Sequence, residues 1–134
     1  MARYMRLSIT EKESNGRLAR EILVHEGITI CSFCFLIVEL FGGESDFFPL
    51  FASPDKTLYG PSFLEAYHPY EEALLKKAIL TDLEAPSLVR YSDGKGATYL
   101  FAVSLVEEEE KEGERLVYVL SGKGKGIFGP HKRF

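Results

Sequence analysis

The stretch Thr29–Gly43, TICSFCFLIVELFGG, is the longest nearly uninterrupted apolar segment of the 134-residue chain. Such a segment gains most when it is removed from water, so the other elements are expected to pack around it. It is shorter than the roughly 20 residues that a helix needs to cross a bilayer. Thr29 can cap a helix and Gly42-Gly43 can end it, so the segment predicts a buried helix. Because a fully apolar run has no decisive periodicity, a buried strand is the alternative.

A β-hairpin is predicted before this helix. Residues Tyr4–Thr10 alternate between apolar and polar side chains, as a half-buried strand does. Asn15-Gly16 is typical of a tight turn, and Arg17–His25 follows as the second strand. Arg20 has the inward-facing parity of that strand. It must therefore reach the sheet edge, find a carboxylate or serve a binding site, because an unpaired buried charge is costly.

Shorter elements are predicted after the helix. Phe47–Ala52 is interrupted by Pro49, which removes a backbone donor and favours an edge strand or a bulge. Leu58-Tyr59 is a brief strand. A second, amphipathic helix is expected from Pro69, because proline suits the first helical position. Its core-facing residues would be Leu74, Leu75, Ala78 and Ile79.

The last predicted elements are strands. Leu88–Ser92 and Ala97–Val106 flank a glycine-containing turn and are expected to form a hairpin. Residues 107–114, which are rich in glutamate, predict a solvated hairpin loop because like charges repel and stay hydrated. Arg115–Leu120 would be the third partner across that loop.

These elements together predict an α+β fold. It consists of an antiparallel sheet of about five strands, a buried helix after the first β-hairpin and a second amphipathic helix. Residues 1–122 are expected to form a single domain, and residues 123–134 a basic, glycine-rich C-terminal tail. Two cysteines and the lack of a signal-peptide pattern favour a cytoplasmic protein with no membrane association.

The two cysteines, Cys31 and Cys34, have the C-x-x-C spacing of redox and zinc sites. The flanking pattern of a redox site and two further zinc ligands are missing, so buried structural cysteines are the preferred interpretation, with no metal and no cofactor. The glycine-rich segment Ser121–Gly126 lacks the spacing and the following helix of a phosphate-binding loop. No pattern of catalytic residues stands out, which favours a protein that is not an enzyme.

The formal net charge of −4 is unevenly distributed. Residues 1–20 carry five basic and two acidic side chains, and residues 123–134 carry four basic and no acidic ones. Basic ends of this kind can contact phosphate backbones. The candidate nucleic-acid-binding residues are Arg17, Arg20, Lys123, Lys125, Lys132 and Arg133. A protein partner or a homo-oligomer is a further expectation, and a degenerate small-ligand or catalytic pocket near Arg20 is the alternative function.

A family resemblance adds to these expectations. It rests on RLAREILV at residues 17–24, on spaced apolar anchors from Ile28 to Gly42, on FFPLF at residues 47–51 and on the YSDG turn at residues 91–94. In these segments the chain resembles the plasmid pRiA4b ORF-three-like family, whose members are associated with plasmids and other mobile elements and have no firmly established reaction. The resemblance implies the family fold and an accessory role in a mobile element. The chain departs from the family at Ala19, Cys34 and Gly43, where tryptophan, histidine and tryptophan are usual.

Overall fold

The computed structural model of the chain describes residues 2–14, 17–43, 48–79, 86–92, 98–113 and 115–123. Its strands are β1 (Ala2–Glu11), β2 (Ala19–His25), β3 (Leu50–Ala52), β4 (Leu58–Gly60), β5 (His68–Pro69), β6 (Ser87–Ser92), β7 (Thr98–Lys111) and β8 (Val117–Lys123). Its helices are the 3-10 helix η1 (Lys12–Ser14) and the α-helices α1 (Ile30–Leu40) and α2 (Leu75–Ala78).

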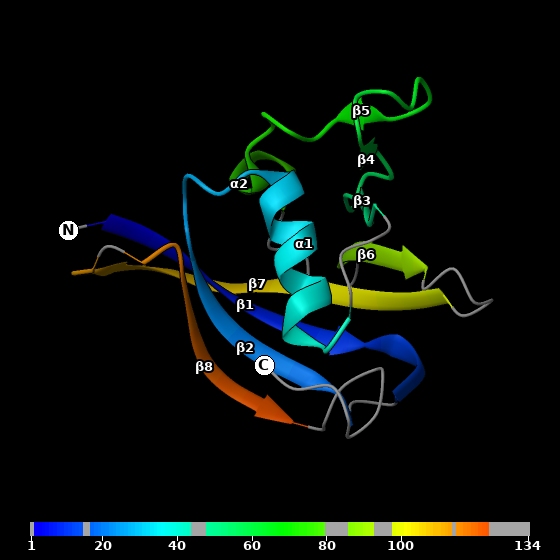
Figure 1. Ribbon diagram of the computed structural model, residues 1–134. Coiled ribbons are helices and arrows are strands. Elements are labelled where there is room, and N and C mark those ends of the chain that lie inside the picture. Colours follow the sequence, from blue (N-terminus) through cyan, green and yellow to red (C-terminus); the bar gives the residue numbers. More distant parts are fainter. Residues whose placement is uncertain are drawn as a thin grey trace.

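The strands form one sheet in the order β5-β4-β3-β6-β7-β1-β2-β8, and α1 lies across one face of it (Figure 1). All neighbouring pairs are antiparallel except β4 and β5, which are parallel. The predicted five-stranded antiparallel sheet is therefore wrong, and the fold is an eight-stranded mixed sheet with two short α-helices. We call the face that α1 covers the inner face and the opposite one the outer face.

Short strands account for part of this difference. β3, β4 and β5 contain only two or three residues each, too few to show the alternation by which a strand is recognised. β3 lies between β4 and β6, so the predicted edge position of this segment is also wrong. Pro49 immediately precedes β3, where its missing N–H does not interrupt the pairing.

The end of the chain pairs differently from the prediction as well. β8 lies beside β2 and not beside β7. The glutamates at 107–110 belong to β7 and not to a loop, because they lie opposite β1, where Arg3 and Arg6 form ion pairs with them. Opposite charges on neighbouring strands compensate the repulsion that made a loop the expected structure.

The helix predicted from the apolar segment is present. Thr29 is its N-cap, with Oγ1 accepting a 3.1 Å hydrogen bond from the amide of Ser32, and Gly42 follows it with a φ of 85°. α1 buries Ile30, Phe33, Cys34, Ile37 and Val38. They pack on residues of the inner face that include Met5, Leu7, Ile9, Ile22, Val24, Val89, Phe101 and Val103.

The second predicted helix is largely wrong, since α2 has four residues and Pro69 lies in β5. The segment before α2 instead caps α1: the amides of Ile30 and Cys31 donate to the carbonyl oxygens of Ala73 and Tyr70, at 2.8 and 3.1 Å. The first amides of a helix lack partners within the helix. The carbonyl oxygens of Ala73 and Tyr70 supply these missing acceptors. They therefore do not accept hydrogen bonds from a helix within their own segment. Three of the four apolar residues expected to face the core are buried, namely Leu75, Ala78 and Ile79.

Candidate functional site

Arg20 in β2 lies on the inner face beside the end of α1. Its guanidinium carbon is 4.8 Å from the centre of the Phe41 ring, and Nη1 donates a 2.7 Å hydrogen bond to the carbonyl oxygen of Ala19. Gly122 on β8 leaves room for this side chain, because a Cβ there would be 3.0 Å from Cδ of Arg20. Burial lowers the pKa of Arg20. An aromatic ring and a backbone carbonyl thus accommodate the inward-facing charge noted in the sequence.

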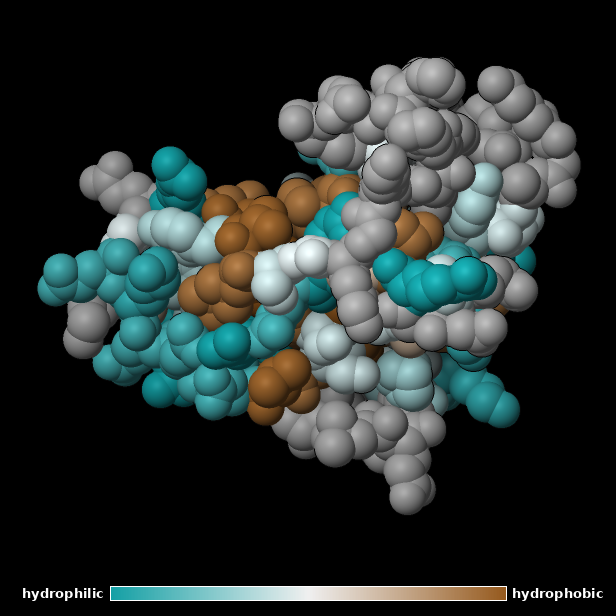
Figure 2. Space-filling model, turned by 90° about the horizontal axis from the view of Figure 1, so that it is seen from below, coloured by the Kyte–Doolittle hydropathy of each residue, from teal (hydrophilic) through white to brown (hydrophobic). Residues whose placement is uncertain are grey.

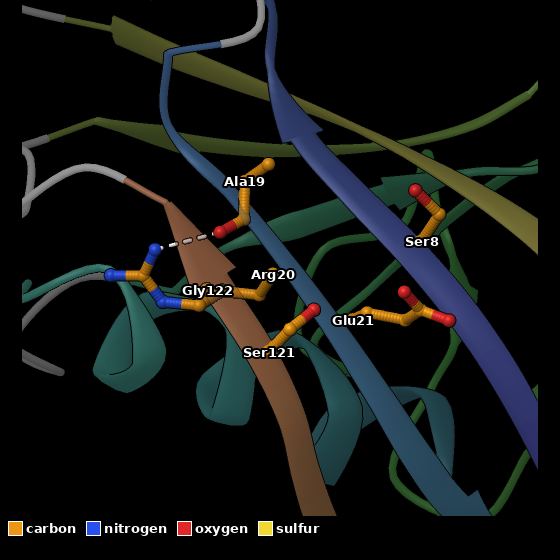
Figure 3. Close-up of a pocket in the computed structure, with 6 residues that line it drawn as sticks. All are labelled: Ser8, Ala19, Arg20, Glu21, Ser121 and Gly122. Atoms are coloured by element: carbon orange, nitrogen blue, oxygen red, sulfur yellow. Dashed lines mark hydrogen bonds between the residues drawn. The ribbon is translucent and has the colours of Figure 1, made fainter.

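A cavity of about 180 Å³ lies next to Arg20 and is lined by Ser8, Ala19, Arg20, Glu21, Ser121 and Gly122. Figure 3 shows that the guanidinium points away from the side chains of Ser8 and Glu21. The carboxylate of Glu21 accepts a hydrogen bond from Nε of Arg6. The polar groups of this cavity therefore do not converge on Arg20.

The basic residues predicted to contact nucleic acid are partly brought together. Ala19 is paired with Lys123 across β2 and β8, and the exposed Arg17 lies two residues before Ala19. Arg17 Nε donates a 3.0 Å hydrogen bond to the carbonyl oxygen of Ser14. We call Arg17, Arg20 and Lys123 the basic corner of the sheet. Lys125, Lys132 and Arg133 lie outside the described residues.

Two other basic residues near the N-terminus are neutralised by carboxylates. Arg6 pairs with Glu21 and lies 3.6 Å from Glu107 and 3.9 Å from Glu109. The hydrogen bond to Glu21 and the surrounding carboxylates raise the pKa of Arg6. Arg3 lies 3.6 Å from Glu108 and 3.8 Å from Glu110. The excess of positive charge at the N-terminal end is therefore smaller on the folded surface than in the sequence.

The two cysteines are free thiols at the beginning of α1. Cys34 is fully buried and Cys31 is half-buried. Burial raises the pKa of both thiols, which is the opposite of what a reactive thiolate needs. Among the described residues there is no group of three His, Cys, Asp or Glu side chains that could hold a metal ion.

A second cavity, which sequence reasoning missed, lies on the outer face. It has a volume of about 200 Å³ and is lined by Leu50, Phe51, Ala52, Leu58, Tyr67, Leu88, Arg90 and Leu100. We call it the outer pocket. The sequence did contain a hint of this pocket. The strand predicted at Ala97–Val106 has apolar residues at both odd and even positions, so both of its faces are apolar.

Hydrophobic side chains also reach the surface. Those of Phe48, Leu58, Phe63, Val106, Leu116, Val119 and Leu120 are exposed, and Figure 2 shows hydrophobic patches among hydrophilic residues on one side of the molecule. Across the described ranges, neither α-helix has the length and hydrophobicity required to span a membrane. Exposed hydrophobic patches of this kind are common at interaction sites.

The fold and its cavities define a class of protein: a mixed eight-stranded sheet with α1 on its inner face and, among the described residues, no helix on its outer face. No family model matches the chain, and no curated protein matches it significantly. A solved structure does: a protein of unknown function, MM3350, from Methanosarcina mazei Go1. The TM-score is 0.79 at 19% sequence identity, and the match covers 95% of this chain and 72% of that chain. At this identity the similarity establishes a shared fold.

Proposed function

We propose that the chain is a non-enzymatic accessory protein that contacts the phosphate backbone of nucleic acid through its basic corner and the basic segment that follows it. The observation that supports this most is the pairing of Ala19 with Lys123. It places the beginning of β2, with Arg17 and Arg20, beside Lys123, which directly precedes the basic segment 124–134 in the sequence. The resemblance to the pRiA4b ORF-three-like family adds the proposal that the protein belongs to a mobile element.

The charge distribution favours the basic corner over β1 as the place of phosphate contact. Arg3 and Arg6 are paired with glutamates. The neighbouring carboxylates compensate their positive charge, so these two residues attract a polyanion only weakly. Arg17 is exposed, and its side chain donates a hydrogen bond to the neutral carbonyl of Ser14. Lysine and arginine bind phosphates mainly through charge, and each phosphate neutralised releases counterions. Binding should consequently be sequence-independent and strongly weakened by salt.

A second candidate function is a small-ligand site in the cavity beside Arg20. The hydroxyl and carboxylate groups of Ser8, Glu21 and Ser121 favour it. The orientation of Arg20 toward Phe41 and Ala19 gives it less support than the basic corner has.

The proposal is tested by fluorescence anisotropy of a labelled duplex and a labelled single strand, titrated with the full chain at several salt concentrations. Replacing Arg17 and Lys123 together by glutamine should weaken binding and reduce the salt slope by roughly two, because each phosphate contact contributes about one. Deleting residues 124–134 should reduce it further. Lys77→Gln is the control, since Lys77 is exposed on α2 and is not part of the basic corner.

Three outcomes would overturn the proposal. One is a lack of binding at low salt. Another is a salt slope that stays the same in the double variant and the deletion, which would place the contacts elsewhere. The third is an equal loss of binding free energy per removed charge in Lys77→Gln and in the double variant, because it would show that total charge and not the basic corner determines binding.

A further inference from the structure

The outer face of the sheet is divided into two zones of different chemistry. Over β1, β2 and β7 it carries the charged group of Arg6, Glu21, Glu107 and Glu109. Over β3, β4 and β6 its residues are mainly apolar, because Phe51, Val89 and Phe101 point to the core and their neighbours in sequence point outward. No helix is seen over this apolar zone among the described residues, and the zone forms the outer pocket.

The strand register explains why the outer pocket is apolar. Ala52 is paired with Leu58 on β4 and with Leu88 on β6, so three aliphatic side chains form a row across the sheet. Leu50 lies in the next row, beside Arg90, which is itself paired with Leu100. Small Ala52 in the middle of the first row leaves space between the larger leucines.

Tyr67 forms one wall of the outer pocket. It comes from the loop between β4 and β5 and lies against Gly60: a Cβ on Gly60 would be 3.2 Å from Cγ of Tyr67 and 2.9 Å from Cδ2 of Leu50. The missing side chain therefore lets Tyr67 and Leu50 approach β4 closely. The wall limits the pocket to about 200 Å³, roughly six or seven times the volume of a water molecule in the liquid.

Among the described residues that line the outer pocket, Arg90 is the charged one. Its side chain is exposed and forms no ion pair with any side chain in the part of the chain that the structure describes. A guanidinium at the rim of an apolar hollow can bind a carboxylate with two parallel hydrogen bonds. Small-ligand sites commonly combine an apolar lining with a few polar groups that fix the orientation of the ligand.

We propose that the outer pocket binds a small monocarboxylate with an apolar body. The carboxylate contacts Arg90, and the body lies against Leu50, Ala52, Leu58, Leu88 and Leu100. A single arginine supplies the charge for one carboxylate, and the volume of the pocket fits a short aliphatic chain. The site is on the opposite face of the sheet from Arg20 and is independent of the contact to nucleic acid proposed above.

The test uses sodium octanoate as the probe and octylamine as its oppositely charged counterpart, with binding measured by calorimetry and by NMR shifts. The full chain should bind octanoate at one saturable site and octylamine much more weakly. Arg90→Gln should weaken octanoate binding about tenfold, the usual effect of losing a hydrogen bond to a charged group. Arg90→Glu should reverse the preference so that octylamine binds better.

Two further variants complete the test. Ala52→Phe fills the pocket and should abolish octanoate binding, with an unchanged far-UV spectrum as the check of folding. Lys77→Gln is the control, because it removes an exposed positive charge outside the pocket and should leave octanoate binding unchanged. The proposal is overturned if no saturable binding is found up to concentrations on the order of 10 mM. It is also overturned if Arg90→Gln binds octanoate as the native chain does, or if octanoate and octylamine bind equally.

Discussion

Single residues of the sheet accommodate positive charge in two ways. On the outer face, Arg6 is surrounded by the carboxylates of Glu21, Glu107 and Glu109. On the inner face, Arg20 lies over the Phe41 ring. An arginine over an aromatic face gains about 0.5–2 kcal/mol, depending on how far it is desolvated. The side-chain alternation places Arg20 on the inner face, but the partner that it finds there comes from the end of a helix more than 20 residues later.

Gly113, between β7 and β8, is a residue whose replacement should be costly. Its φ is +155°, and a Cβ there would lie within 1.9 Å of the Tyr118 hydroxyl oxygen. The Tyr118 ring packs against the ring of Tyr4, with 5.6 Å between the two ring centres. We predict that Gly113→Ala lowers the free energy of unfolding by about 1–3 kcal/mol, through backbone strain and displacement of that ring, as measured by urea denaturation.

The Tyr118→Phe background separates the two causes of this loss. Without the hydroxyl the nearest atom to the added Cβ is the ring carbon, 3.1 Å away, so Gly113→Ala should cost less there than in the native chain. An equal cost in both backgrounds would assign the whole effect to the backbone. A neutral Gly113→Ala would show that this turn adapts to a side chain.

At the scale of elements, α1 combines local and long-range contributions to its N-terminus. Thr29 caps it through its own hydroxyl, and Ala73 and Tyr70 accept hydrogen bonds from its first amides. The local cap is readable from the sequence, because Thr followed by an apolar run is a helix-start signal. The hydrogen bonds to Ala73 and Tyr70 are not readable from the sequence, because they depend on which distant segment packs against the start of the helix.

The contribution of the local cap can be measured. Thr29→Ala should lower the free energy of unfolding by about 1 kcal/mol, since it leaves the amide of Ser32 without its side-chain acceptor. Thr29→Ser is the control and should retain most of the stability, because serine also caps well. If alanine and serine behave alike in urea denaturation, the backbone contacts from residues 70–73 are sufficient to hold this helix end.

Other elements were predictable only where one signal dominated. The first hairpin has clear alternation, and its pairing of Leu7 with Ile22 is observed. β5 is two residues long, which is less than a recognisable pattern, and its pairing with β4 results from the loop that connects them. The glutamates of β7 predicted a loop because their partners Arg3 and Arg6 are about 100 residues away in sequence.

At the scale of the whole molecule, the order of the strands is the main property that local patterns do not contain. β1 lies between β7 and β2, and β8 lies beside β2, so the first and the last strand are both neighbours of β2. The candidate site depends on this. The sequence identified Arg17, Arg20 and Lys123 as basic residues, but only the pairing of β2 with β8 brings them to one corner. The outer pocket requires four strands in the correct order and could not be found from any single segment.

Alkaline pH should destabilise the whole molecule, because burial raises the pKa of several weak acids in its interior. These are the thiols of Cys31 and Cys34 and the phenols of Tyr4 and Tyr70. The folded chain retains these protons at pH values at which the unfolded chain has released them. These groups should therefore leave stability unchanged at pH values below the ordinary thiol pKa of 9.0. Above it, stability should fall as the pH rises toward the higher pKa values of the folded state.

The measurement is the urea midpoint from about pH 7 to about pH 11, for the native chain and for Tyr70→Phe. The Tyr70 hydroxyl is buried, and the thiol of Cys31 is a weak partner for it, so its removal should change stability at neutral pH only slightly. The fall in stability above the ordinary phenol pKa of 10.0 should be shallower in the variant. If the two curves are parallel, the alkaline loss arises at groups other than Tyr70.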